Sequence, residues 1–331
     1  MPELRKDPVV GRWVIIATER ARRPGNFIDR TYLPNQTDPR DCPYCHLTER
    51  PIYQHKGGIS VVPFRGSFLA IENTLQRKTH GLYDILNTFG VHEVVVETSE
   101  HIDNMSDLTL PQIQGVFETY ANRMEDLQND ENLMFITAYK NFGSAAGSRL
   151  IEHARSHIMS TPVNPQRFKD KLSGARKYFK THRSCVYCDL IRQELKEKSR
   201  VILESEHFIC FIPFAARYLF EIWIVPKKHN CDFYKSVKGV EADLAMVMKN
   251  VLNKCKAGLE EPAYNYIINT APFRRKGLSP ERWNTIDQDF HWHIELTPRL
   301  TQLAGFEKGT GFYICAIAPE MMAEYLRGIE V

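Results

Sequence analysis

The tetrapeptide Cys42-Pro-Tyr-Cys45 has a counterpart in Cys185-Val-Tyr-Cys188, near the middle of the 331-residue chain. A Cys-x-x-Cys pair offers two thiolates from one tight turn, which is half of a tetrahedral zinc shell. Redox-active or free thiols are the other interpretation of such a pair taken alone. Because the motif occurs twice, we first ask whether the chain is an internal repeat.

The segments that follow the two pairs match in order. His92-Glu-Val-Val-Val-Glu97 and Phe220-Glu-Ile-Trp-Ile-Val225 are rich in β-branched and aromatic residues, which predicts a strand in each. A histidine lies just beyond each run, His101 after the first and His229 after the second. The chain therefore predicts two copies of one strand-containing unit.

Each copy also contains a later strand and a histidine cluster. Residues 133–138 and 264–269 predict the strands, and each leads through a loop to the cluster of its half. The clusters are His153-Ala-Arg-Ser-His157 and His291-Trp-His-Ile-Glu295. Side chains at i, i+2 and i+4 share one face of a strand. Helices are expected at 108–129, 168–180, 190–199 and 236–258.

Thiolates and imidazoles together suit Zn²⁺, and histidines from distant strands would tie each cysteine turn to the rest of its half. We predict two zinc sites, one in each half. The two predicted ligand sets are Cys42, Cys45, His101 and His153, and Cys185, Cys188, His229 and His291. The other cysteines are expected to be buried apolar side chains.

Composition limits the classes of partner. The net charge is only +3 and 43% of the residues are hydrophobic, so nothing in bulk calls for nucleic acid or membrane as a partner. No long uninterrupted apolar run predicts a transmembrane helix, and the charged N-terminus lacks an apolar signal core. We therefore expect a cytoplasmic globular protein.

Several stretches resemble galactose-1-phosphate uridylyltransferases of the histidine-triad superfamily. They follow one another in the order typical of that family and cover nearly the whole chain; plant-type ADP-glucose phosphorylases are close relatives in the superfamily. The stretches are residues 5–17, 20–24, 141–147, 290–299 and 304–314. The resemblance implies an α+β fold of two histidine-triad-like halves, 1–168 and 169–331, each an antiparallel sheet with flanking helices and stapled by zinc. It also implies a homodimer.

The resemblance further implies ping-pong nucleotidyl transfer between a nucleotide sugar and a sugar phosphate. In this reaction a histidine nitrogen attacks the α-phosphorus of a nucleoside diphosphate sugar, and a second phosphate acceptor then takes the nucleotide. The expected function is that of a nucleotidyltransferase in galactose metabolism, similar to UDP-glucose–hexose-1-phosphate uridylyltransferase. An ADP-glucose phosphorylase-like adenylyltransferase and an inactive nucleotide-binding paralogue are the alternatives.

The first-half cluster departs from the family pattern, which is His-x-His-x-Gln with the middle histidine as nucleophile. Here Arg155 stands at the nucleophile position and His157 at the glutamine position. Arginine stays protonated and cannot attack phosphorus. Three hypotheses remain open. Arg155 clamps a phosphate while His157 or His293 acts as nucleophile or base, catalysis has moved to His293 with Glu295 beside it, or the protein is inactive.

The resemblance assigns further residues to the substrate. Guanidinium groups match phosphate geometry, and glycines allow backbone N–H groups to approach an anion closely. Taken without the resemblance, the arginines indicate a solvated basic turn and the glycines ordinary turns. The predicted substrate-binding residues are Arg20, Arg23, Asn141, Gly143, Gly147, Glu295 and Lys308.

Overall fold

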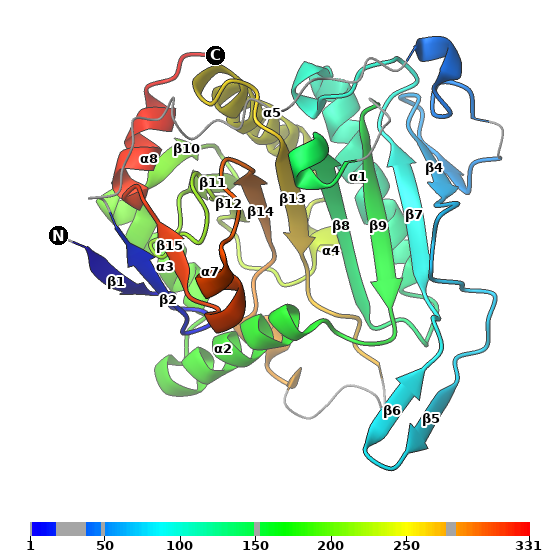
Figure 1. The fold of residues 1–331 in the computed structure, drawn as a ribbon, viewed down its shortest axis with the longest axis horizontal. Helices are drawn as coiled ribbons and strands as arrows, with labels where there is room; N and C mark the ends of the chain where they lie inside the picture. The colour runs from blue at the N-terminus through cyan, green and yellow to red at the C-terminus, as the bar shows by residue number, and fades with distance from the viewer. Residues whose placement is uncertain (1, 18–37, 48–49, 149–152, 276–282) are drawn as a thin grey trace.

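A single ten-stranded antiparallel sheet forms the centre of the molecule (Figure 1). The computed structural model describes residues 2–17, 38–47, 50–148, 153–275 and 283–331. The sheet has the order β10-β11-β12-β14-β13-β8-β9-β7-β4-β3, and every neighbouring pair is antiparallel. Its strands are β3 (Tyr53–Gln54), β4 (Ser60–Pro63), β7 (Val91–Val96), β8 (Phe135–Phe142), β9 (Arg155–Thr161), β10 (Val201–Glu204), β11 (Phe208–Phe211), β12 (Ile222–Pro226), β13 (Tyr264–Asn269) and β14 (His293–Pro298).

The strands that the sequence predicts all occur, with small shifts at their ends. The predicted strand at 264–269 has the same bounds as β13. The predicted strand at 220–225 begins too early, because Phe220 has a φ of 56°, in the left-handed region, and β12 starts only at Ile222. The α+β class and the antiparallel sheets with flanking helices are confirmed.

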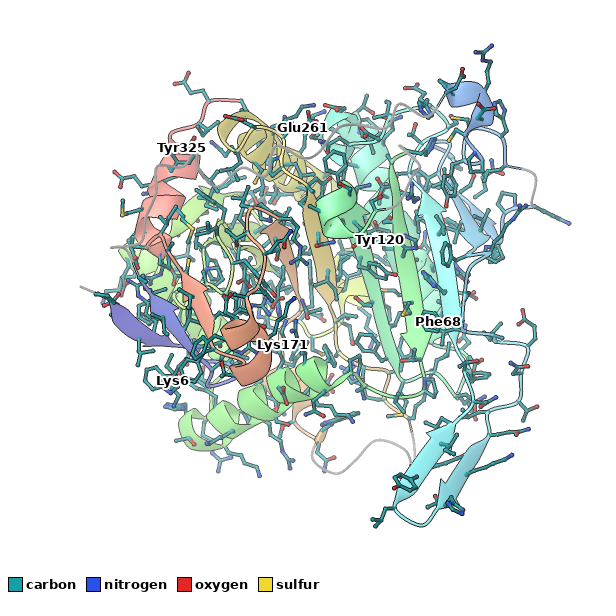
Figure 2. The ribbon with its side chains drawn as sticks, viewed as in Figure 1. Lys6, Phe68, Tyr120, Lys171, Glu261 and Tyr325 are labelled. Atoms are coloured by element: carbon teal, nitrogen blue, oxygen red, sulfur yellow. The ribbon has the colours of Figure 1, made fainter. Side chains whose placement is uncertain are left out.

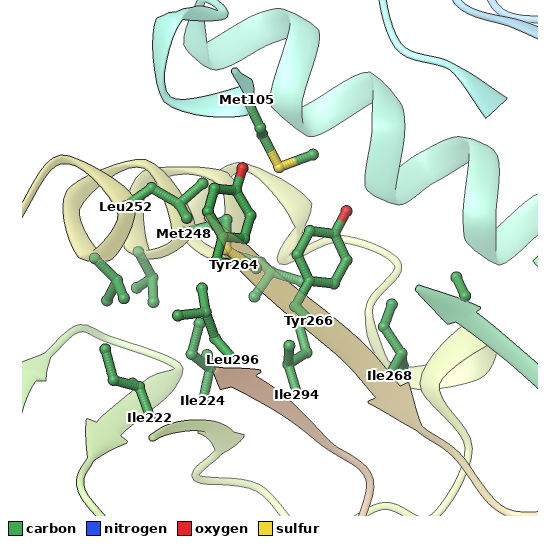
Figure 3. Packing of buried hydrophobic residues seen from close by; sticks show 14 of the residues in the cluster. Met105, Ile222, Ile224, Met248, Leu252, Tyr264, Tyr266, Ile268, Ile294 and Leu296 are labelled. Carbon is green, nitrogen blue, oxygen red and sulfur yellow. The ribbon is translucent and has the colours of Figure 1, made fainter. Parts of the chain in front are cut away.

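Two long helices, α1 (Leu110–Leu127) and α5 (Glu241–Gly258), pack against each other. Thr109 and Gln112 form a capping box that satisfies N–H groups at the start of α1. The expected helix at 236–258 is interrupted: a short α4 (Phe233–Ser236) ends before α5 begins. Side chains of β13 and β14 point toward the two long helices and form the main core (Figure 3).

The two halves of the chain join in the middle of the sheet, where β8 pairs with β13. The pairing is supported from the helix side by a chain of buried hydroxyl groups. Figure 2 labels Tyr120, which belongs to α1. Its hydroxyl lies 2.7 Å from that of Tyr266 on β13 and 2.5 Å from the hydroxyl of Ser156 on β9. One hydrophobic cluster contains residues of both halves, so the repeats share a core.

The other face of the second-half sheet is covered by α2 (Gln166–His182), whose Lys171 side chain reaches β14. The predicted boundary between residues 168 and 169 falls inside this helix. A three-stranded sheet, β1-β2-β15, lies at the end of the molecule away from β4 and β7 (Figure 1). The remaining elements are β1 (Glu3–Lys6), β2 (Trp13–Ile16), β5 (Arg77–His80), β6 (Tyr83–Leu86), β15 (Tyr313–Cys315), α3 (Val186–Glu197), α6 (Ile286–Asp289), α7 (Gly305–Thr310), α8 (Pro319–Arg327) and the 3₁₀ turns η3 (Pro39–Asp41), η4 (Met105–Asp107) and η5 (Ser144–Ala146).

The β5–β6 hairpin projects from the lower edge of the molecule in Figure 1. Within the described ranges, no helix has both the length and the apolar character needed to cross a bilayer.

Candidate functional site

The four predicted ligands of the first half come together between the turn at Cys42 and the strands β7 and β9. Their ligand atoms all lie within 4.8 Å of one another. The Cys45 sulfur lies 3.2 Å from Nδ1 of His101 and 3.7 Å from Nδ1 of His153, and the Cys42 sulfur lies 3.6 Å from the same His153 nitrogen. In a tetrahedral zinc site with usual bond lengths, sulfur and nitrogen ligands are separated by about 3.5 Å. The donor set therefore fits Zn²⁺.

A hydrogen bond to the backbone orients the His153 ring. Its Nε2 lies 2.9 Å from the carbonyl oxygen of Thr98, which can only accept a hydrogen bond. Nε2 must therefore carry the proton, and the lone pair of Nδ1 points toward the thiols. Fixing the tautomer in this way is the usual arrangement around a metal-bound histidine.

The second-half ligands form an equivalent cluster. Their ligand atoms also lie within 4.8 Å of one another, and the Cys188 sulfur is 3.2 Å from Nδ1 of His229 and 3.6 Å from Nδ1 of His291. Nε2 of His229 lies 3.0 Å from the carbonyl oxygen of Asp287, which fixes its tautomer as in the first half. Cys185 is the N-cap residue of α3, so this helix begins at the predicted site.

A third group of metal-ligand types, Cys231, Asp232 and Asp287, differs from these two clusters. The guanidinium group of Arg274 donates to both carboxylates and lies 2.7 Å from the Cys231 sulfur. A cation from the chain already neutralises this group, so we assign no metal to it.

Arg155 and His157 lie on the same face of β9, as the two-residue period predicts. The Arg155 side chain is 9% exposed, and its guanidinium carbon stands 5.3 Å from the centre of the Tyr44 ring. It also donates to the hydroxyl of Ser148 at 3.3 Å. A positive group therefore stands beside the first cysteine turn, next to the loop that begins at Gly143.

His157 is held by His92, a residue of β7 for which the sequence predicts only a strand position. Nε2 of His92 lies 3.1 Å from Nδ1 of His157 and 3.3 Å from the hydroxyl of Tyr139. Tyr139 stacks on the His157 ring at 5.1 Å, and Phe64 contacts the same ring edge-on at 5.6 Å. Among the described residues, no protein group bonds to Nε2 of His157.

The surroundings of this histidine pair keep it neutral. Burial is the main cause that lowers the pKa of His157 to about 3, and His92, Arg155 and Lys140 act in the same direction. Burial also lowers the pKa of His92. A neutral imidazole has one nitrogen with a free lone pair, which is the form that can act as a nucleophile or base.

The second-half histidine cluster, at residues 291–295, differs from the first because its polar side chains are hydrogen-bonded to protein groups. His293 is fully buried between the rings of Trp223 and Tyr187. Its Nε2 lies 3.1 Å from Nζ of Lys171, and Nδ1 lies 3.0 Å from the carbonyl oxygen of His291. A substrate would have to displace these groups to reach either ring nitrogen.

Glu295 belongs to the same closed network. One carboxylate oxygen accepts from Lys171 at 2.5 Å and the other from Arg217 at 2.8 Å. Although burial acts to raise it, these two cations hold the pKa of Glu295 well below its usual value. Arg217 also pairs with the buried Glu221 at 2.5 Å.

The loop that precedes the first-half cluster is attached to the second half. Gly143 and Gly147 have φ values of 79° and 88°, so both positions need glycine. Between them lies the turn η5. The side-chain nitrogen of Asn265 on β13 donates to Oδ1 of Asn141 at 2.6 Å and to the carbonyl oxygen of Ala146 at 2.8 Å. Arg299 in turn donates to Oδ1 of Asn265.

The remaining predicted substrate residues are not all placed. Lys308 is exposed on α7, and its side chain makes no hydrogen bond or ion pair within the described part of the chain. Arg20 and Arg23 lie outside the described residues. Sequence reasoning missed His92, Tyr139, Lys171 and Asn265 as site residues. Alternation along β8 could have indicated Tyr139, because it shares a face with Asn141.

Both halves match models of one protein family. Residues 1–165 match the N-terminal domain of galactose-1-phosphate uridyl transferase, and residues 171–308 match the C-terminal domain. ADP-glucose phosphorylase of Arabidopsis thaliana is 32% identical over 342 residues, covering 100% of this chain and 93% of that protein. Galactose-1-phosphate uridylyltransferase of Thermotoga maritima is 29% identical, covering 100% and 99%.

Solved structures agree with these matches. The crystal structure of the Arabidopsis thaliana ADP-glucose phosphorylase with bound ADP-glucose has a TM-score of 0.82 at 31% identity, and the match covers 100% of both chains. A uridylyltransferase structure has a TM-score of 0.76 at 25% identity, covering 99% of this chain and 97% of that one. The enzymes in these comparisons support nucleotidyl transfer as the general type of reaction. The chain belongs to the galactose-1-phosphate uridylyltransferase family.

Proposed function

We propose that this protein is a nucleotidyltransferase that acts on a nucleoside diphosphate sugar and a sugar 1-phosphate or phosphate acceptor, with His157 as its nucleophile. The observation that carries the proposal is the environment of His157. One ring nitrogen is held by His92 at 3.1 Å, and the other has no protein partner among the described residues. The imidazole is therefore fixed in orientation and free at the atom that would react.

The proposed reaction has two displacements. When Nδ1 of His157 carries the proton and donates a hydrogen bond to Nε2 of His92, Nε2 of His157 is unprotonated and can attack the α-phosphorus. The bond to the bridging oxygen breaks and sugar 1-phosphate leaves. An oxygen of the second phosphate then attacks the same phosphorus, and the phosphorus–nitrogen bond breaks. Each step exchanges one bond for another, and His157 is restored.

Arg155 would stabilise the charge that develops in both displacements. Residues i and i+2 of a strand stand about 6.7 Å apart, so a phosphate can lie between His157 and the guanidinium group. The loop between Gly143 and Gly147 would add backbone N–H donors. Bound Zn²⁺ would hold Cys42, Cys45, His101 and His153, and would thereby fix the start of β9; we assign it no step in the transfer.

We assign His293 and Glu295 a supporting role. His293 is fully buried, and Lys171 and Arg217 engage the Glu295 carboxylate on both oxygens. The hydrogen bonds of this network hold α2 against β14. The His157 ring, in contrast, is partly exposed. These contacts favour the hypothesis of altered chemistry in the first half over the hypothesis that catalysis has moved to the second.

The identity of the nucleotide separates two activities. The relative at 32% identity is an ADP-glucose phosphorylase, which favours an adenylyl group and inorganic phosphate as acceptor. A uridylyl group and a hexose 1-phosphate acceptor would instead place the protein in galactose metabolism. We also propose that the protein forms a homodimer.

A labelling experiment tests the proposal. The protein is incubated with UDP-glucose or ADP-glucose carrying ³²P at the α-phosphate, and a base-stable, acid-labile protein adduct is sought. We expect the adduct in the wild type and in His293→Ala, and its loss in His157→Ala. His207→Ala, at a partly exposed histidine that belongs to neither cluster, is the matched control. An adduct that persists in His157→Ala would refute the assignment of the nucleophile.

The same experiment detects the inactive alternative. Tight nucleotide binding by the wild type with neither adduct nor turnover would identify a binding protein. Turnover without adduct would instead indicate direct transfer from donor to acceptor.

A further inference from the structure

A basic groove runs along the outer face of α2, away from the side chains of the histidine clusters. It has a volume of about 230 Å³. Its α2 residues recur at the spacing of one helix face, and Trp283 forms part of the wall. The groove is lined by Leu172, Ser173, Arg176, Lys177, Lys180 and Trp283.

The three cations of this α2 groove lack a direct ion-pair partner among the described residues, and Arg176 acts at longer range on the buried carboxylate of Asp289. Arg176, Lys177 and Lys180 have no side-chain hydrogen bond or ion pair with any described residue, and no carboxylate lines the groove. Several other basic side chains are paired; Arg123, Arg200 and Arg217 each contact two or more carboxylates. Three like charges within two helical turns repel one another, and an anion bound among them would lower this repulsion.

We propose that the α2 groove binds a polyphosphate group, as in pyrophosphate or a nucleoside di- or triphosphate, at a site separate from the one at His157. Two or three adjacent phosphates match the three cations in number, and a guanidinium group can hold phosphate oxygens in a bidentate manner. Trp283 supplies apolar surface beside the charges. This surface would contact the nucleoside if the ligand is a nucleotide.

The side of α2 that faces away from the groove is packed against the protein and hydrogen-bonded to it, so the groove does not need to form on binding. Leu172 and Ala175 are buried in a cluster with Phe290, and Lys171 bonds to Asn269 and Glu295. Reversing charge on the exposed side therefore leaves the packed side of α2 intact. The site does not use any residue of the proposed reaction, so the two proposals can fail independently.

Calorimetric titration of the full-length protein with pyrophosphate, ADP and ATP tests the proposal. The double variant Arg176→Glu, Lys180→Glu should bind pyrophosphate at least about 100-fold more weakly than the wild type, while the adduct at His157 forms as before. Lys196→Glu on α3, where the lysine has no ion pair with a described residue, should bind as the wild type does. Circular dichroism and a melting curve verify that the variants are folded.

The outcomes are distinct. Tighter binding of ADP or ATP than of pyrophosphate, with a change in Trp283 fluorescence that is lost in Trp283→Phe, would identify a nucleotide as the ligand. Equal binding of all three would identify the phosphate groups alone. If the double variant binds all three compounds as the wild type does, or if the wild type binds none of them below 10 mM, the proposal is wrong.

Discussion

At the scale of single residues, the two histidine clusters show that equivalent positions in a repeat can take different roles. His157 and Glu295 occupy matching positions of the two halves, yet no described residue bonds to Nε2 of His157, while both carboxylate oxygens of Glu295 accept hydrogen bonds. Nearby charge explains the difference. Lys171 and Arg217 bond directly to Glu295 in the second half, whereas His92, Tyr139 and Phe64 surround the His157 ring and the cations Arg155 and Lys140 act on it without a direct bond.

The lowered pKa of His157 predicts how activity depends on pH. Burial holds this pKa at about 3, so the imidazole stays neutral when the solution is mildly acidic. Protonation of Nε2 is the event that would stop its attack. The acid limb of kcat/KM should therefore lie below the ordinary histidine pKa of about 6.5. A limb at 6.5 or above in a pH series from 4.5 to 8 would contradict the proposed environment of the nucleophile.

Sequence patterns were sufficient to predict that the cysteines and histidines of each half converge, because these side chains recur in the same order in both halves. The same patterns could not predict the contact between His92 and His157. That contact depends on the register in which β7 pairs with β9, where Val94 rather than His92 lies opposite His157. It also depends on side-chain reach along a diagonal of the sheet. The sequence contains no local signal of either.

At the scale of elements, the packing of α2 depends on a residue without a side chain. A Cβ atom at Gly174 would lie 1.8 Å from the carbonyl oxygen of Val9. The helix can therefore approach the N-terminal segment only at a glycine. The burial of His293 depends on this same helix, since Lys171 projects from it into the second-half cluster. Sequence reasoning predicted the helix but could not predict which strand it covers.

Gly174→Ala should destabilise the protein even though alanine favours helix by about 1 kcal/mol. Relief of the clash requires the backbone to move, which costs about 1–3 kcal/mol in typical overpacked sites. Urea unfolding gives the change in the free energy of unfolding. Gly309→Ala is the matched control, because a Cβ there meets nothing within 4 Å among the described residues. Equal stability of the two variants would show that the contact with Val9 does not hold in solution.

The loop between Gly143 and Gly147 supports a second prediction at this scale. Asn265 donates to both Asn141 and Ala146, so its removal should loosen the loop without touching His157. We expect Asn265→Ala to raise KM for the nucleotide sugar by about 10-fold, as the loss of two hydrogen bonds implies. The amount of labelled adduct formed at saturating nucleotide sugar should change less. Asn250→Ala, on the exposed face of α5, provides the control. A fall in kcat with unchanged KM would count against a role in binding.

At the scale of the whole molecule, each metal cluster joins a cysteine turn to histidines far away in sequence. We expect elemental analysis to find two zinc ions per chain. Removing the metal with a chelator should lower the melting temperature, because bound metal stabilises the folded state by about 4 kcal/mol when free metal is 1,000 times its Kd.

Variants at each cluster locate the metals. Cys42→Ser and Cys185→Ser should each reduce the zinc content by one equivalent, and Cys255→Ser, at a buried cysteine outside both clusters, should leave it unchanged. A full zinc content in either cluster variant would show that the metal is held elsewhere.

The pairing of β8 with β13 has a consequence for a chain that has been cut. A protease that cleaves near the exposed Val163 would break the covalent link between the repeats. The pairing of β8 with β13 and the contact between α1 and α5 would stay in place. The two fragments should then travel together through gel filtration and separate only in denaturant. A fragment made alone would display the bare strand edge that its missing neighbour normally covers, and it should associate with other chains through that edge.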